Sequence, residues 1–226
     1  MQLPEFFDLV PRLRVHDPLA EALGSSRDGI LEYGYGDAVR LTGHSCPTVA
    51  SAYWLTWLAL RALYPATLPE RGGLKVEMRE DARCGSVGVV ASVVQMLTGA
   101  AGNSGFKGLG GRYARAGLMR TAPDLPLSMR YTRLDNGDAV DASADVTLLP
   151  EDPALPGLLD LCARGRADAQ ALGRLADAWQ RRVRCLLIEK AHDGGVFIVR
   201  PVWRRAAAAN ERHASFAGRR RGEAPS

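Results

Sequence analysis

One apolar stretch dominates what this chain can fold into. From Pro47 to Tyr64 the residues are good helix formers, Pro47 suits the first helical position, and Pro65 ends the run. Apolar side chains surround the segment almost completely, which is typical of a helix buried on all sides. Polar residues interrupt it, and it falls short of the roughly 20 apolar residues that a membrane span needs. We therefore expect a central buried helix and no membrane span.

Shorter elements precede this helix. Asp17 is the expected N-cap of a first helix, with Pro18 at its first position. Residues 30–35 and 38–43 flank a Gly-Asp pair and predict two short strands or, as the alternative, an extended entry to the long helix. The N-terminal part of the chain is therefore expected to mix short helices with short strands.

The middle of the chain alternates between strand, helix and loop. Residues 74–80 alternate at period two, which predicts a half-buried strand. Residues 87–97 favour a second buried helix, although five β-branched valines leave a strand as the alternative. Six of the thirteen residues in 99–111 are glycine, which predicts a loop, and a short helix is expected over residues 112–120.

The C-terminal half adds two expected hairpins. Residues 128–149 predict a β-hairpin around an Asn-Gly turn, and residues 153–179 predict two helical segments separated by a glycine. Residues 183–202 predict a second hairpin. This irregular mixture indicates an α+β fold, with a mostly antiparallel sheet packed against the long buried helix, in one domain over residues 1–203.

The net charge of +4 is concentrated at the C-terminus. Residues 204–226 hold six arginines and two glutamates, so the rest of the chain is neutral overall and lacks the charge pattern of a nucleic-acid-binding fold. We expect this basic tail to be disordered, with contact to phosphates, a membrane surface or an acidic partner as the alternative. The N-terminus resembles no secretory leader, so a cytoplasmic location with reduced cysteines is expected. Cys162 and Cys185 lie in apolar runs and are expected to be core residues.

Residues able to carry chemistry gather just before the long helix, in the sequence Gly-His-Ser-Cys-Pro. With Pro47 at the first helical position, Cys46 is the N-cap, where free amide groups and the helix dipole favour a thiolate. An extended lead-in would point His44 to the same side. Imidazole and thiolate together suit zinc or another divalent transition metal. The alternatives are a metal-independent thiol enzyme, with Cys46 as nucleophile and His44 as base, and a packed turn without chemistry.

Two further segments supply candidate residues. Cys84 follows the strand expected at residues 74–80, and a strand beside the buried helix would bring Cys84 within reach of Cys46 as a third metal ligand. The alternatives are a turn cysteine that faces solvent or core, with the third ligand supplied by Glu77, Asp81 or a second subunit. Lys107 lies in the glycine-rich loop, whose bare backbone can close on an anion or on a metal-bound ligand; a flexible linker is the alternative.

Together these segments resemble a known family. Gly-His-Ser-Cys-Pro at the start of an apolar helix, the strand LKVEMRED, and QMLTG before a Gly/Lys loop resemble the FmdE family, named for one of the subunits of formylmethanofuran dehydrogenase. The resemblance covers residues 31–133 and implies an α+β fold, a homodimer, and zinc or another transition metal bound through His and Cys. His44 and Cys46 match the family's G-H-x-C-P, and Lys107 approximately matches its Gly-Lys-Gly-Asn lysine. Ala100 stands where family members have cysteine, and no C-terminal C-x-x-C zinc ribbon is present.

The residues and the resemblance together predict a metal-binding protein, in redox or C1-type metabolism. A metal at His44, Cys46 and Cys84 would hold a small-molecule ligand facing the glycine-rich loop, with Lys107 neutralising the ligand's negative charge. Cys46 and Lys107 are then the candidate catalytic residues. The thiol enzyme and a non-catalytic binding module are the competing hypotheses.

Overall fold

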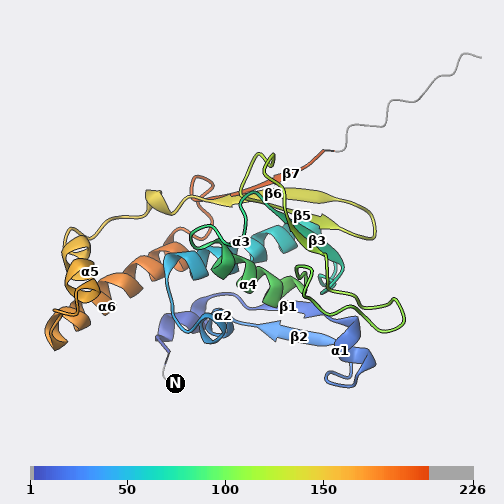
Figure 1. The fold of residues 1–226 in the computed structure, drawn as a ribbon, viewed down its shortest axis with the longest axis horizontal. Helices are drawn as coiled ribbons and strands as arrows, with labels where there is room; N and C mark the ends of the chain where they lie inside the picture. Colours follow the sequence, from blue (N-terminus) through green and yellow to red (C-terminus); the bar gives the residue numbers. More distant parts are fainter. Residues whose placement is uncertain (1–2, 204–226) are drawn as a thin grey trace, which may run out of the picture.

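The computed structural model describes residues 3–203, so the basic tail at 204–226 lies outside the described residues. The helices, in chain order, are η1 (Glu5–Leu9), α1 (Pro18–Ala22), α2 (Tyr35–Thr42), α3 (Pro47–Leu63), α4 (Val87–Thr98), η2 (Val146–Leu148), α5 (Leu155–Ala163), α6 (Ala169–Arg184) and η3 (Cys185–Glu189). The strands are β1 (Leu13–His16), β2 (Ile30–Tyr33), β3 (Leu74–Met78), β4 (Met119–Thr121), β5 (Met129–Arg133), β6 (Ala139–Ala144) and β7 (Phe197–Pro201). The predicted α+β class is confirmed (Figure 1).

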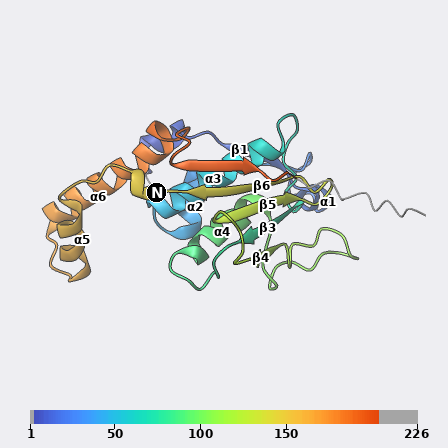
Figure 2. The same cartoon turned by 90° about the horizontal axis from the view of Figure 1, so that it is seen from above.

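Five strands form the main sheet, in the order β4-β3-β5-β6-β7 (Figure 2). All neighbours are antiparallel except β3 and β4, as the prediction of a mostly antiparallel sheet requires. The register aligns Val76, Tyr131 and Val140 in one apolar row across the sheet. The adjacent row faces the other side, where Arg130 donates two hydrogen bonds to the Asp141 carboxylate at 2.6 and 2.8 Å. The sheet therefore has one face for the core and one polar face.

Helix α3 lies in the middle of the molecule, between this sheet and the layer formed by α2 with the β1–β2 pair (Figure 1). Its sides are buried all round, which explains why its sequence has no polar face. On the sheet side, the Thr56 hydroxyl lies 2.9 Å from the Tyr131 hydroxyl. Elsewhere on the helix, Trp54 Nε1 donates to the Ala191 carbonyl at 2.6 Å. The predicted central helix is confirmed.

Helix α4 packs beside α3. Residues 87–97, for which the sequence allowed either a helix or a strand, are therefore helical. Val93 and Val94 are fully buried, so tertiary packing outweighs the modest strand preference of β-branched residues. The helix also contacts α2, which places it between the sheet and the lower layer.

One predicted strand is a helix instead. Residues 38–43 belong mainly to α2, which starts after Gly34. The Asp37 carboxylate accepts a hydrogen bond from the Gly34 N–H at 2.8 Å and so stabilises the helix start. Gly43, with φ of 77°, ends the helix in the left-handed conformation. These two capping signals outweigh the short alternating pattern on which the strand prediction depended.

The short helix predicted over residues 112–120 is absent from the structure. Tyr113 has a φ of 62°, which no right-handed helix accommodates. The Arg115 N–H donates to the Phe106 carbonyl at 2.7 Å, and the Arg115 side chain reaches Asp17. The segment is a loop held by these contacts, and it continues into β4.

The hairpin predicted over residues 183–202 is only half correct. The first strand does not exist, because α6 continues into η3, a π-helix whose Leu186 and Leu187 are buried against the core. The second strand is β7, and it pairs with β6. A short apolar run fits a buried helix as well as a buried strand, and this explains the error. The hairpin of β5 and β6 is confirmed, and the second local antiparallel pair is β1 with β2.

Helices α5 and α6 project together from the end of the molecule away from β4 (Figures 1 and 2). They break near Gly165, as predicted. Cys162 on α5 is exposed, so the expectation that it is a core residue is wrong, whereas Cys185 is buried as expected. Among residues 3–203, no helix combines the length and the apolar character that crossing a membrane requires.

Candidate functional site

Cys46 forms the N-cap of α3, as predicted. Its Sγ accepts a hydrogen bond from the Val49 N–H at 3.5 Å. The residue is only 8% exposed. Its neighbour Ser45 is tied to α6, because Trp179 Nε1 donates to the Ser45 carbonyl at 3.0 Å and the Ser45 hydroxyl donates to Gln180 at 3.0 Å. The thiol is therefore set at the junction of α3 with α6.

His44 is exposed and bonds to its own backbone. Its Nδ1 lies 3.0 Å from the Thr42 carbonyl oxygen. A carbonyl only accepts, so Nδ1 carries the proton and Nε2 of the neutral ring keeps its lone pair. This arrangement is typical of histidines that bind metals. Within the described residues no hydrogen bond joins His44 to Cys46, so the acid–base pair of the thiol-enzyme hypothesis is not assembled.

Cys84 lies in the turn that precedes α4, where its carbonyl accepts from the Val87 N–H at 3.0 Å. Its side chain is exposed. Across residues 3–203, no group of three or more His, Cys, Asp or Glu side chains is placed to hold a metal ion. His44, Cys46 and Cys84 therefore do not form a three-residue ligand set within one chain. These residues do not fit a complete zinc site, and no chemical step through a metal follows from them.

Lys107 belongs to the loop between α4 and β4, and this loop lies at the other end of the molecule from the start of α3 (Figure 1). Arg115 anchors this loop, because its Nη2 donates to Asp17 Oδ1 at 2.8 Å. Arg71 Nη1 donates to the second oxygen of the same carboxylate at 2.8 Å. The loop thus lies beside α1 and β1, whereas the start of α3 lies beside α2 and α6 (Figure 1). The expected arrangement, with Lys107 facing His44 and Cys46, does not occur.

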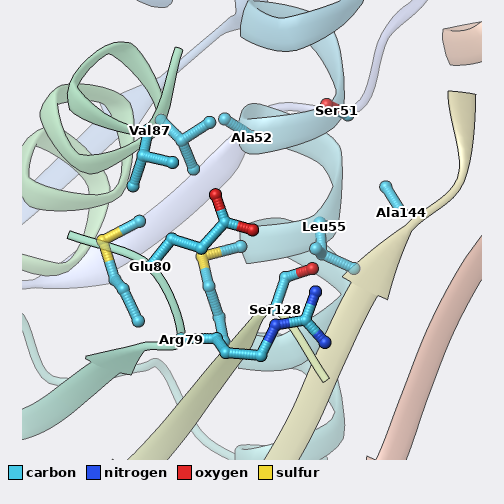
Figure 3. Close-up of a pocket in the computed structure, with 11 residues that line it drawn as sticks. Ser51, Ala52, Leu55, Arg79, Glu80, Val87, Ser128 and Ala144 are labelled. Carbon is cyan, nitrogen blue, oxygen red and sulfur yellow. The ribbon is translucent and has the colours of Figure 1, made fainter. Parts of the chain in front are cut away.

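A pocket that the sequence did not suggest opens between α3, α4 and one end of the main sheet (Figure 3). Its volume is about 160 Å³. Apolar side chains supply most of its wall, and these are Ala52, Leu55, Met78, Val87, Val90, Met129 and Ala144. Ser51, Ser128, Arg79 and Glu80 add the polar groups. An apolar cavity with a few converging polar groups is the usual form of a small-molecule site.

The sheet register builds the floor of this pocket. Met78 and Met129 are direct partners at the last pairing of β3 with β5, so their side chains leave the same face of the sheet. Thioether side chains are flexible and adapt to the shape of a guest. Ser128 precedes this pair, and its hydroxyl lies 2.9 Å from the hydroxyl of Ser143. Two adjustable side chains thus lie beneath an opening that carries polar groups.

The charged residues of the pocket follow directly after β3. The strand ends at Met78 and the chain bends at Arg79 and Glu80, so that both side chains extend toward the pocket (Figure 3). The Arg79 N–H donates to the Ser128 carbonyl at 2.9 Å and holds this bend. Within residues 3–203, neither side chain forms an ion pair, whereas the next charged pair, Asp81 with Arg83, is joined at 2.8 Å. Among residues 3–203, the pocket therefore presents a guanidinium and a carboxylate without ion-pair partners.

The sequence pattern places Arg79 and Glu80 inside a strand over residues 74–80. Strict alternation would send the two side chains to opposite faces, so the pattern marks neither of them as a site residue. One sequence signal does indicate that the strand ends before Arg79. Three consecutive charged residues, Arg79, Glu80 and Asp81, follow the last apolar residue of the strand, and such a run favours a strand end. Locating the pocket also required the packing of α3 against α4, which no local pattern contains.

Comparison with known proteins does not assign a function to this chain, so the function has to be argued from the pocket geometry. No family model matches the chain, and no curated protein matches it. The resemblance through residues 31–133 accordingly stays a prediction.

Proposed function

We propose that this chain is a small-molecule-binding protein whose ligand occupies the pocket between α3, α4 and the end of the main sheet. One observation carries the proposal: an apolar cavity of about 160 Å³ has two charged side chains, Arg79 and Glu80, at its wall without ion-pair partners within residues 3–203. Buried charges that support the fold are normally paired, as Asp17 is with Arg71 and Arg115.

The size of the cavity limits the ligand. Pockets for drug-sized molecules occupy roughly 300–1,000 Å³, so a cavity of about 160 Å³ holds a metabolite of only a few carbon atoms. A dry apolar cavity of similar size, roughly 150 Å³, is known to accept benzene. Affinity for an apolar guest follows from removing its surface from water against Leu55, Met78 and Met129.

The first test uses the neutral alcohol 3-methylbutan-1-ol as a probe of the apolar cavity. In the full chain, titration with this alcohol should shift the methyl NMR signals of Met78 and Met129 in a saturable way. Ser51→Phe places a large side chain from α3 into the pocket and should abolish the shifts. Ser92→Phe is the matched control, because Ser92 is also a helical serine bonded to a preceding carbonyl but lies on α4 outside the pocket wall.

Three results would overturn the proposal. The first is the absence of saturable shifts in the unsubstituted chain. The second is an equal loss of binding in both phenylalanine variants. The third is binding that persists unchanged in a folded Ser51→Phe protein. Far-ultraviolet circular dichroism and the thermal midpoint establish that each variant is folded.

A second proposal keeps the metal hypothesis for His44 and Cys46. It is supported by the tautomer of His44, whose Nδ1 is held by the Thr42 carbonyl so that Nε2 can accept a metal. Two donors are too few for a stable zinc site, so a second copy of the chain would have to supply the others. Elemental analysis of the purified protein should then find a transition metal that is lost in His44→Ala and Cys46→Ala, and the chain should sediment as a dimer. Metal-free dimers or monomers with the native fold would contradict this proposal.

A further inference from the structure

We infer that the pocket recognises a zwitterion, namely a small α-amino acid with an aliphatic side chain. Its carboxylate would bind the Arg79 guanidinium, its ammonium group would bind the Glu80 carboxylate, and its side chain would enter the apolar part of the cavity. This inference rests on the proposed function and specifies the ligand class of the same pocket.

The charges of the pocket favour a ligand with both signs. Arg79 and Glu80 are consecutive in the chain and both line the cavity, yet no ion pair joins them to each other within residues 3–203. An anion alone would be attracted by Arg79 and repelled by Glu80, and a cation alone would meet the reverse situation. An α-amino acid carries its two charges on neighbouring atoms and satisfies both side chains at once. Guanidinium–carboxylate contacts also form paired, charge-assisted hydrogen bonds.

The apolar wall favours an aliphatic side chain beside those charges. Leu55 comes from α3, Val87 from α4, and Met78 from the floor of the cavity, so the wall surrounds a guest from three elements. Figure 3 shows the Glu80 carboxylate extending over this apolar part, toward Val87 and Ala52, and the Arg79 guanidinium beside Ser128. Ser51 uses its hydroxyl on its own helix, at 3.1 Å from the Thr48 carbonyl, and offers little to a polar side chain. A leucine-like group fits this chemistry better than a polar one.

The experiment compares four compounds that share a 3-methylbutyl group. L-Leucine carries both charges, 4-methylpentanoate only the carboxylate, 3-methylbutan-1-amine only the ammonium group, and 3-methylbutan-1-ol neither. Calorimetric titration of the full chain should show leucine binding about tenfold or more tightly than any of the other three, since each charge-assisted contact contributes roughly this factor. Affinity for leucine should also decrease with added salt.

Two substitutions assign the charges to their partners. Arg79→Gln should weaken leucine and 4-methylpentanoate about tenfold but leave 3-methylbutan-1-amine unchanged or slightly stronger. Glu80→Gln should weaken leucine and 3-methylbutan-1-amine and spare 4-methylpentanoate. Asp81→Asn is the matched control, because Asp81 is the next acidic residue but is paired with Arg83 outside the pocket, and it should change none of the four affinities by more than about twofold.

The outcomes separate this inference from the proposed function. If the alcohol binds and leucine binds no more tightly, the pocket is a ligand site but its zwitterion specificity is refuted. The specificity is also refuted if leucine binds but neither substitution distinguishes the acid from the amine. If none of the four compounds reaches the pocket in the unsubstituted chain, the proposed function and the inference both fail.

Discussion

Two regions of this molecule use arginine and acidic side chains in opposite ways. Beside the glycine-rich loop, one carboxylate, that of Asp17, accepts from both Arg71 and Arg115 and is only 4% exposed. At the pocket, Arg79 and Glu80 are exposed and have no ion-pair partners among residues 3–203. The first set of charges is saturated and holds three segments of chain together. The second is available to a ligand.

This difference shows which charges serve the fold. Asp17 also caps α1, accepting from the Leu19 and Ala20 N–H groups at 2.9 and 3.1 Å, so one carboxylate supports a helix start and two arginines. Arg115 is so closely packed that its Nε is buried with no hydrogen-bond partner within the described residues. Substitutions near Asp17 should therefore change stability, and substitutions at the pocket should change binding.

The largest expected effect is that of Asp17→Asn. Asparagine keeps an oxygen that caps α1 but removes the charge that two arginines share, and breaking a buried ion pair from one side costs about 3–5 kcal/mol. We expect the free energy of unfolding in urea to fall by about 3 kcal/mol or more. Asp168→Asn is the control, since Asp168 caps α6 from an exposed position without an ion pair among residues 3–203, and it should change stability by less than about 1 kcal/mol. Equal effects of the two substitutions would show that Asp17 acts only as a cap.

The next effect tests how tightly Arg115 is enclosed. Gly72 has φ of +87°, and a Cβ added there would lie 1.3 Å from Arg115 Nη1, whereas Gly110 has φ of +55° with nothing within 4 Å of such an atom. Both alanine variants carry the backbone strain of a positive φ, about 1–2 kcal/mol. Gly72→Ala must also displace the Arg115 guanidinium from Asp17. We therefore expect the free energy of unfolding in urea to fall by about 1–3 kcal/mol more for Gly72→Ala than for Gly110→Ala. Similar losses in the two variants would mean that Arg115 moves aside at no cost.

A smaller expected effect is the dependence of stability on pH in the acid range, which arises from Asp17. Burial raises the pKa of Asp17, but hydrogen bonds from Arg71 and the Ala20 N–H, together with the charge of Arg115, outweigh it and hold the pKa below its ordinary value of 3.8. The stabilisation is therefore complete above that ordinary value and is lost as the pH falls through the lower folded value. Between about pH 6 and about pH 3, the unfolding free energy should fall more steeply for the unsubstituted protein than for Asp17→Asn. Parallel curves would contradict this assignment.

The elements of this fold that the sequence predicted correctly are those with strong local signals. Pro47 and Pro65 bracket α3, Asp17 caps α1, and an Asn-Gly turn joins β5 to β6. The errors arise where distant contacts decide. Residues 112–118 form a loop, in which Arg115 reaches Asp17, a residue 98 positions earlier in the chain. No local pattern contains that contact.

The candidate site was less predictable than the fold. The helix-start position of Cys46 follows from Pro47. Its separation from the loop that holds Lys107 depends on tertiary packing, which puts the start of α3 beside α2 and α6 and that loop beside α1 and β1. The pocket depends on where β3 stops, since one further strand residue would send Arg79 and Glu80 to opposite faces. Neighbouring charges in a sequence do not show whether they will be paired, and this is the property that distinguishes the two regions.

The smallest expected effect on stability belongs to the pocket itself. Arg79→Gln and Glu80→Gln each remove an exposed charge without an ion-pair partner among the described residues, so each should change the free energy of unfolding by no more than about 0.5 kcal/mol. The same two variants are expected to lose binding of leucine. Substituting a residue that supports the fold would have the reverse effect. The free energy of unfolding would fall, and binding would weaken only as far as the folded fraction of the protein decreased. If either glutamine variant unfolds in urea at least about 2 kcal/mol more easily than the unsubstituted chain, the charges at the pocket are structural, like those around Asp17, and the contrast between the two regions disappears.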